Sequence, residues 1–150
     1  MAGRPSFAGL PAARGKRFAI AVSRFHEALT RRMLRGAVET LRRCGVRAGD
    51  IRVLWVPGAY ELPLAAQRLA RAKPHAIICL GMVIRGATPH FDYVAGGAAQ
   101  GITQVALRER LPVIFGVVTA GTRRQAEARV TRGRDAAQTA VAMATSRRRR

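Results

Sequence analysis

Cysteine and long apolar runs are both scarce in this 150-residue chain. Its two cysteines, Cys44 and Cys79, have no other metal-ligand side chains beside them at a useful spacing. This argues against a disulfide framework and favours two reduced thiols in a cytoplasmic protein. No apolar run reaches the roughly 18 residues that a membrane helix needs. Pro5, Pro11 and Arg14 also interrupt the stretch where the apolar core of a signal peptide would lie.

The common catalytic signatures are missing as well. The sequence has no Gly-Lys-Ser/Thr phosphate loop, no dinucleotide glycine fingerprint after its first predicted strand, no zinc-ligand spacing and no nucleophile elbow. These absences argue against nucleotide hydrolysis, hydride transfer and metal catalysis.

Acidic residues and lysines are few, whereas arginines are abundant. Eight acidic residues face 27 basic ones, which gives a formal net charge of +19, and only Lys16 and Lys73 among the basic residues are lysines. Such a surface favours anionic partners such as phosphates, nonspecifically bound nucleic acid or a membrane surface. An arginine-rich composition that is simply a habit of the source organism explains the charge equally well. The terminal run of arginines at 147–150 is expected to be a mobile basic tail.

Apolar runs and helical patterns alternate along most of the chain. Residues 1–15 are expected to form a flexible arm, and 16–146 a single domain. Strands are predicted at 17–23, 51–56, 76–82 and 113–118. Helices are predicted from Leu29 to a stop at Gly45, over 62–72, over 91–110, and over 125–144 with a break near 131–133. This alternation indicates an α/β fold in which helices cover both faces of one open parallel sheet.

The unusual side chains follow the predicted strands. An open parallel sheet binds ligands beyond the carboxyl ends of its strands, so we expect segments 23–26, 56–61, 81–90 and 115–119 to form one site. Phe25 and Tyr60 are candidates for stacking on a heterocycle, or else ordinary rim or core aromatics. Glu61 is a candidate acceptor from ligand hydroxyls, or else a first-turn glutamate that favours its helix dipole. Together these segments suit a flat, hydroxylated, phosphorylated ligand.

A helix start near residue 89 adds a candidate phosphate site. Thr88 is predicted to be the N-cap and Pro89 the first helical residue, directly after the turn at Gly86. The free N–H groups of such a helix start attract phosphate. His90 would lie in the first turn, where the helix dipole favours a neutral imidazole that can carry protons. A purely structural histidine is the alternative.

Read in order, these segments resemble the 6,7-dimethyl-8-ribityllumazine synthase family. The similarity rests on Arg24-Phe25, on VPGAYELPLAA at 56–66, on LGMVIRGATPHFDYV at 80–94 and on PVIFGVVT at 112–119, and it covers about residues 15–145. It implies a flavodoxin-like, three-layer αβα fold with a four-stranded parallel sheet. It also implies homo-pentamers, some of which assemble further into decamers or icosahedral shells, with active sites between adjacent subunits.

The resemblance further implies a reaction of riboflavin biosynthesis and a role for each matching residue. The family condenses 5-amino-6-(D-ribitylamino)uracil with 3,4-dihydroxy-2-butanone 4-phosphate and releases phosphate and water, without a cofactor, because the pyrimidine's own amine forms the imine. His90 would move protons, and Phe25 would stack on the pyrimidine. The other implied substrate contacts are Ala59, Tyr60 and Glu61 for the ribityl chain, main-chain groups of Val83 and Ile84 for the ring edge, and Phe115 from a neighbouring subunit. The implied phosphate contacts are Gly86, Ala87 and Thr88, with Arg129 from the neighbour and Arg132 in place of the usual lysine.

The chain departs from the family pattern at three places. His26 stands where asparagine is usual, Arg124 replaces the glutamate of a Thr-x-Glu-Gln-Ala pattern, and Thr131-Arg132-Gly133 replaces Asn-Lys-Gly. Arginine suits phosphate as well as lysine does. The changes nevertheless leave open a catalytically weakened member that acts as a basic shell protein or as a flavin- or lumazine-binding protein.

Overall fold

A four-stranded parallel sheet forms the centre of the molecule. The computed structural model describes residues 9–146 and orders the strands β2-β1-β3-β4. The strands are β1 (Phe18–Ser23), β2 (Ile51–Val56), β3 (Ala76–Ile84) and β4 (Val113–Ala120). The helices are α1 (Glu27–Arg43), α2 (Leu62–Ala70), α3 (His90–Glu109), α4 (Arg123–Ala128) and α5 (Arg132–Thr145), with short 3₁₀ turns at Ala48–Asp50 and Ala59–Glu61.

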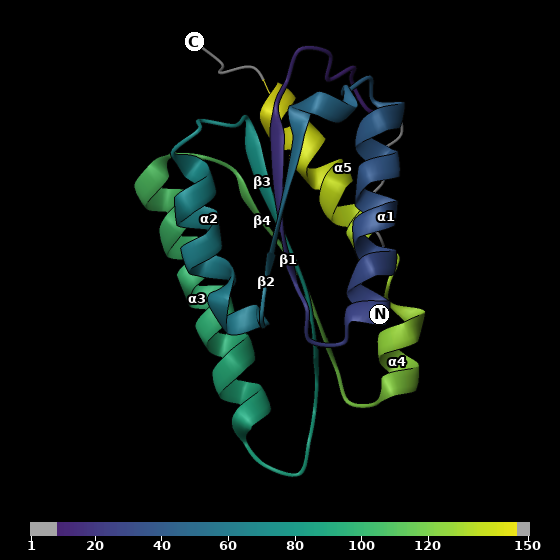
Figure 1. The fold of residues 1–150 in the computed structure, drawn as a ribbon, viewed down its shortest axis with the longest axis vertical. Helices are drawn as coiled ribbons and strands as arrows, with labels where there is room; N and C mark the ends of the chain where they lie inside the picture. Colours follow the sequence, from purple (N-terminus) through teal and green to yellow (C-terminus); the bar gives the residue numbers. More distant parts are fainter. Residues whose placement is uncertain (1–8, 147–150) are drawn as a thin grey trace.

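Helices cover both faces of this sheet, as the alternating pattern predicts. Figure 1 shows α2 and α3 on one side, and α1, α4 and α5 on the other. Alternate residues of each strand point to opposite faces, so each face has its own apolar cluster. One cluster contains Ile20, Ile78 and Val118 under α1 and α5, and the other contains Ala21, Cys79 and Val117 under α2 and α3. The fold is therefore the predicted three-layer, flavodoxin-like arrangement.

The apolar residues at helical spacing in α1 are buried. On α1 the buried residues include Leu29, Met33, Ala37 and Leu41, and Gly45 beyond the helix adopts φ 92°, a conformation that suits glycine. All seven residues of β3 from Ala76 to Met82 are buried. Such burial on both faces explains why this strand has a continuous apolar run rather than an alternating one.

Several boundaries differ from the prediction by one or two residues. β3 continues to Ile84 and β4 to Ala120, because these two strands keep pairing in register from Ile77–Val113 to Ile84–Ala120. α2 ends at Ala70, earlier than expected, and Lys73 then takes a positive φ of 51° before Pro74. The predicted break in the last helical segment is confirmed, since residues 129–131 separate α4 from α5.

The two ends of the chain were predicted to be a flexible arm and a mobile tail. Residues 1–8 and the tail at 147–150 lie outside the described part of the chain. Residues 9–15 contain no helix or strand, but Ala13 is fully buried and its N–H donates to the oxygen of Cys44 at 2.7 Å. Both cysteines are free. Within 9–146 no helix is both long and apolar enough to cross a membrane.

Candidate functional site

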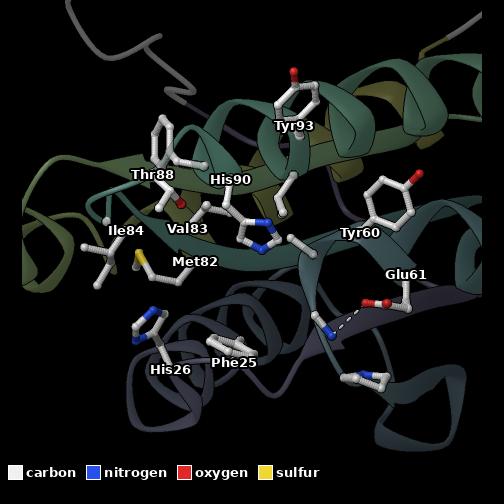
Figure 2. A pocket seen from close by; sticks show the side chains of 16 residues that line it. Phe25, His26, Tyr60, Glu61, Met82, Val83, Ile84, Thr88, His90 and Tyr93 are labelled. Atoms are coloured by element: carbon white, nitrogen blue, oxygen red, sulfur yellow. Dashed lines mark hydrogen bonds between the residues drawn. The ribbon is translucent and has the colours of Figure 1, made fainter.

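A cavity of about 560 Å³ opens at the carboxyl ends of β1, β2 and β3. This is the end of the sheet where an open parallel fold binds ligands, close to the point where the chain order switches between β1 and β3. Figure 2 shows side chains from several separate segments pointing into it. The lining residues are Phe25, His26, Pro57, Gly58, Ala59, Tyr60, Glu61, Met82, Val83, Ile84, Gly86, Thr88, His90, Phe91, Tyr93 and Val94.

The unequal lengths of two strands leave part of β3 open toward this cavity. β1 pairs with β3 only as far as Val22–Leu80, whereas β3 itself continues to Ile84. The N–H of Arg85 donates to the oxygen of Ala120 on the β4 side. Because peptide groups alternate along a strand, those of Ile84 face the open edge and those of Val83 face β4. The main chain of Ile84 is thus available to a ligand, and Val83 contributes its side chain.

The segment between β1 and α1 supplies one wall of the cavity. The N–H of Phe25 donates to the oxygen of Pro57 at 3.0 Å, which fixes the backbone while the Phe25 side chain stays 69% exposed. His26 follows in the left-handed conformation with φ 57° and precedes the first residue of α1. Burial, and then the charge of Arg123, lower the pKa of His26 from its usual value. An exposed aromatic ring and a neutral imidazole therefore lie together.

Tyr60 and Glu61 form the wall that follows β2. Glu61 accepts a hydrogen bond from the N–H of Gly58 at 3.0 Å through Oε2, so one carboxylate oxygen stabilises the short turn. The ring of Tyr60 lies against Gly97 of α3, where an added Cβ would approach Cε2 of Tyr60 to 2.8 Å. The two readings of Glu61 are compatible, because it stabilises its own turn and still lines the cavity.

The loop from Arg85 to Pro89 closes the third side. Arg85 holds this loop against the start of α3, with its Nη2 3.6 Å from Oδ1 of Asp92 and its guanidinium 4.6 Å from the ring centre of Phe91. His90 is the first residue of α3, and its imidazole points into the cavity (Figure 2). The loop therefore brings a helix N-terminus and an imidazole to the same opening.

The predicted capping pattern at this helix is wrong by one residue. Pro89, with φ −71° and ψ 5°, is the N-cap residue of α3, and no side chain caps the helix. Because Pro89 takes the N-cap position, the first helical residue is His90 and not Pro89 as the Thr88-Pro89 pattern predicts. Thr88 lies in the exposed loop and lines the cavity.

Four of the predicted site residues do not line this cavity. Ala87 lies in the loop between two lining residues. Phe115 was expected at the end of a strand, but β4 runs on to Ala120, so Phe115 pairs with Cys79 in the first half of the strand and is 46% exposed at the sheet edge. Arg129 and Arg132 are exposed at the two ends of the link between α4 and α5, and Arg129 donates to the oxygen of Thr119 at 3.4 Å.

Sequence reasoning missed several apolar and aromatic lining residues. Phe91, Tyr93 and Val94 were assigned no role in the site, yet all three line the cavity. Tyr93 follows His90 by three residues and Val94 by four, which places all three on one face of α3. That spacing is the signal that could have identified them.

Cys79 lies in the buried apolar cluster between the sheet and helices α2 and α3. Its complete burial raises the pKa of the thiol to about 12. A thiol with that pKa remains protonated at neutral pH, so Cys79 is not an activated nucleophile. Within the described residues no three His, Cys, Asp or Glu side chains gather as a possible metal site. The chemistry available in the cavity is that of imidazole, hydroxyl, carboxylate and peptide groups.

Comparison with known proteins identifies a family. The model of the 6,7-dimethyl-8-ribityllumazine synthase family matches residues 15–148. A protein of Salinibacter ruber (strain DSM 13855 / M31), named 6,7-dimethyl-8-ribityllumazine synthase, is 47% identical over 137 residues, which cover 87% of this chain and 88% of that protein. The match spans every segment that lines the cavity.

Proposed function

This chain belongs to the 6,7-dimethyl-8-ribityllumazine synthase family, and from that premise we propose that it condenses 5-amino-6-(D-ribitylamino)uracil with 3,4-dihydroxy-2-butanone 4-phosphate. The product is 6,7-dimethyl-8-ribityllumazine, and phosphate and water are released. The observation that carries the proposal is the meeting of Phe25, Glu61 and the Gly86–His90 loop in one cavity. The protein is accordingly a transferase of riboflavin biosynthesis.

The cavity suits the pyrimidine on its Phe25 side. The flat ring stacks on Phe25, and its polar edge bonds to the main chain of Ile84, whose peptide groups face the open edge of β3. Val83 closes the floor with its side chain. Ala59, Tyr60 and Glu61 hold the ribityl chain, and Glu61 accepts hydrogen bonds from its hydroxyls through the carboxylate lone pairs that Gly58 leaves free.

The sugar phosphate binds at the loop before α3. Its phosphate accepts hydrogen bonds from the Gly86–Thr88 segment and benefits from the partial positive charge at the N-terminus of α3. His90 then carries protons between the reacting amine, the carbonyl oxygen and the leaving groups. Proton transfer of this kind contributes about 10²–10⁴-fold, and the rest of the rate comes from holding the two substrates together.

We propose that the site is completed by a second copy of the chain. Phe115, Arg129 and Arg132 lie away from their own cavity, and each is exposed. The α2–α3 face also exposes large apolar side chains, among them Leu64 and Leu107, of the kind found at interfaces between subunits. Phe115 of the neighbour would cover the pyrimidine, and the two arginines would hold the phosphate, in a homo-pentamer or a multiple of it. Two free thiols favour the cytoplasm as the compartment.

The test is an assay of lumazine formation by wild type and by His90→Ala, beside a mass measurement of the particle. We expect turnover by wild type and a loss of about 10²-fold or more, but not a complete loss, in the variant. An unchanged rate in His90→Ala would refute the proton-transfer role. A wild type that does not turn over the two substrates would refute the reaction.

A second candidate function is a basic shell that packages an anionic cargo. The outer face of α1 favours it, because that helix exposes five arginines (Arg31, Arg32, Arg35, Arg42, Arg43) and has only Glu27 and Glu39 as acids. Inactive protein that copurifies with nucleic acid and releases it at high salt would favour this function. A yellow, inactive preparation would instead favour a flavin- or lumazine-binding protein.

A further inference from the structure

The side chain of His26 lines the cavity beside that of Phe25 because the backbone turns at His26. Successive side chains of an extended segment point in opposite directions. Here Phe25 and His26 are consecutive, yet both line the cavity. The left-handed backbone of His26, with φ 57° and ψ 49°, makes the turn that brings the second side chain beside the first. Asparagine, aspartate and histidine are enriched in this conformation among residues other than glycine.

The two rings contact each other edge to face. Their centroids are 5.7 Å apart, and their planes are inclined by 75°. This geometry is a favourable one for aromatic pairs. The Phe25 side chain is largely exposed, and within the described residues the imidazole of His26 is its one aromatic contact at this geometry. The contact therefore restricts the rotamers open to Phe25 before any ligand arrives.

The backbone of His26 is fixed independently of its side chain. Its carbonyl oxygen accepts from the N–H of Leu29 at 2.9 Å and of Thr30 at 3.1 Å, which begins α1. Thr30 also donates its hydroxyl to the oxygen of Ser23 at 2.7 Å, and this ties α1 to the end of β1. Replacing the imidazole therefore leaves the segment in place, provided that the new residue tolerates a positive φ.

We propose that His26 is a positioning residue whose ring holds the Phe25 ring as a preformed platform for a flat heterocycle. The proposal rests on the proposed function and deepens it, because it assigns the recognition of the pyrimidine substrate, and not of the acyclic sugar phosphate, to this pair. A platform ordered in advance reduces the cost of immobilising a side chain when the ligand binds. The usual asparagine of the family has no ring that could make this contact.

The test compares His26→Gly with His26→Asn, since both residues tolerate the left-handed backbone. Glycine removes every side-chain interaction, whereas asparagine keeps hydrogen bonding and removes only the ring. We expect both variants to raise the KM for the pyrimidine about threefold to tenfold, with smaller changes in kcat and in the KM for the sugar phosphate. A pyrimidine KM that rises in His26→Gly and stays at the wild-type value in His26→Asn would overturn the proposal in favour of a hydrogen bond.

A double-mutant cycle with Phe25→Ala gives a readout that a merely structural role would not move. If His26 acts through Phe25, His26→Gly has no further effect on the pyrimidine KM once Phe25 is alanine. Additive effects of the two changes would overturn the proposal. Circular dichroism and thermal unfolding of each variant, measured beside wild type, show that the fold is retained.

Binding of 6,7-dimethyl-8-ribityllumazine, followed by its own fluorescence, separates this inference from the proposed function. Failure of wild type to turn over the two substrates refutes the reaction alone. Threefold to tenfold weaker lumazine binding in His26→Gly still supports the platform in that event. Equal lumazine binding by wild type and His26→Gly refutes the platform, even where the enzyme is fully active.

Discussion

Thr88 and Thr122 both precede a helix, but only one of them caps it. Thr122 precedes α4 with an extended backbone, and its Oγ1 accepts from the N–H of Gln125 at 3.2 Å. Gln125 in turn accepts from the N–H of Gly121 at 2.8 Å through Oε1, so two free donors at this helix start are satisfied. Thr88 stands one residue outside α3 and makes no such bond.

Replacing these two threonines by alanine should therefore have different consequences. Thr122→Ala should lower the free energy of unfolding by about 1 kcal/mol, because it removes an N-cap. Thr88→Ala should change it by less than about 0.5 kcal/mol, because an exposed loop hydroxyl is lost, but it should raise the KM for the sugar phosphate. Urea unfolding measures the first quantity and steady-state kinetics the second. Equal destabilisation by the two changes would mean that Thr88 caps α3 after all.

At the scale of elements, one glycine sets how closely two helices pack. Gly133, in the first turn of α5, lies against α1 so tightly that an added Cβ would collide with the backbone oxygen of Met33. Gly36 faces the same crossing from α1, but a Cβ there would lie 3.5 Å from the nitrogen of Arg134, an ordinary contact. Arg132, the residue before Gly133, is exposed.

Gly133→Ala should therefore destabilise the fold, whereas Gly36→Ala should not. The first change forces α1 and α5 apart and should lower the free energy of unfolding by about 2 kcal/mol or more. The second gains helix propensity at ordinary contact distance and should leave stability unchanged or raise it by up to about 1 kcal/mol. Thermal and urea unfolding of the two variants at equal concentration provide the comparison. A tolerated Gly133→Ala would contradict the close packing at this crossing.

The elements themselves were largely predictable because strong local signals bound them. β2 was placed at its observed bounds, since an apolar run is followed at once by Pro57-Gly58, and the buried stripe of α1 has a clear helical period. The ends of β3 and β4 were placed too early, because their last residues owe their strand conformation to pairing with each other. No window of local sequence contains that pairing.

In the candidate site, too, the residues that local sequence could place differ from those that depend on strand pairing. Residues in the segments that follow β1 and β2, such as Phe25 and Glu61, line the cavity as expected, because parallel strands end at one edge. Phe115 lies in the first half of β4 and outside its own protomer's cavity, so its role from a neighbouring subunit stays a prediction. The edge-to-face contact between Phe25 and His26 depends on the left-handed backbone of His26. The asparagine that the family usually has at this position is only a weak indication of such a backbone.

At the scale of the whole molecule, the positions of the arginines suggest that a second copy of the chain contributes to the site. The cavity holds an imidazole, a helix N-terminus and a stacking ring, but within the described residues no arginine lines it. A doubly charged phosphate normally has a cationic partner in its site. Arg129 and Arg132 are exposed near the α4–α5 link, where a neighbouring copy can use them. A site shared between subunits accounts for both observations.

A shared site predicts complementation between two inactive variants. His90→Ala and Arg129→Ala should each reduce lumazine formation strongly as uniform assemblies. When the two are coexpressed and assemble randomly, about a quarter of the sites should pair an intact His90 with an intact Arg129 of the neighbour, because each interface draws its two faces from different chains. Activity should then rise well above that of either variant alone, as measured on purified mixed particles.

The matched control coexpresses two variants whose altered side chains line the cavity of the same protomer. Coexpression of His90→Ala with Phe25→Ala should give no such recovery, because both side chains line one protomer's cavity and no mixed site regains both. Differently tagged chains, purified in sequence on both tags, establish that the particles are mixed. If His90→Ala and Arg129→Ala form mixed particles without recovering activity, Arg129 does not act across the interface. The phosphate would then have to be held by the loop and helix of one chain alone.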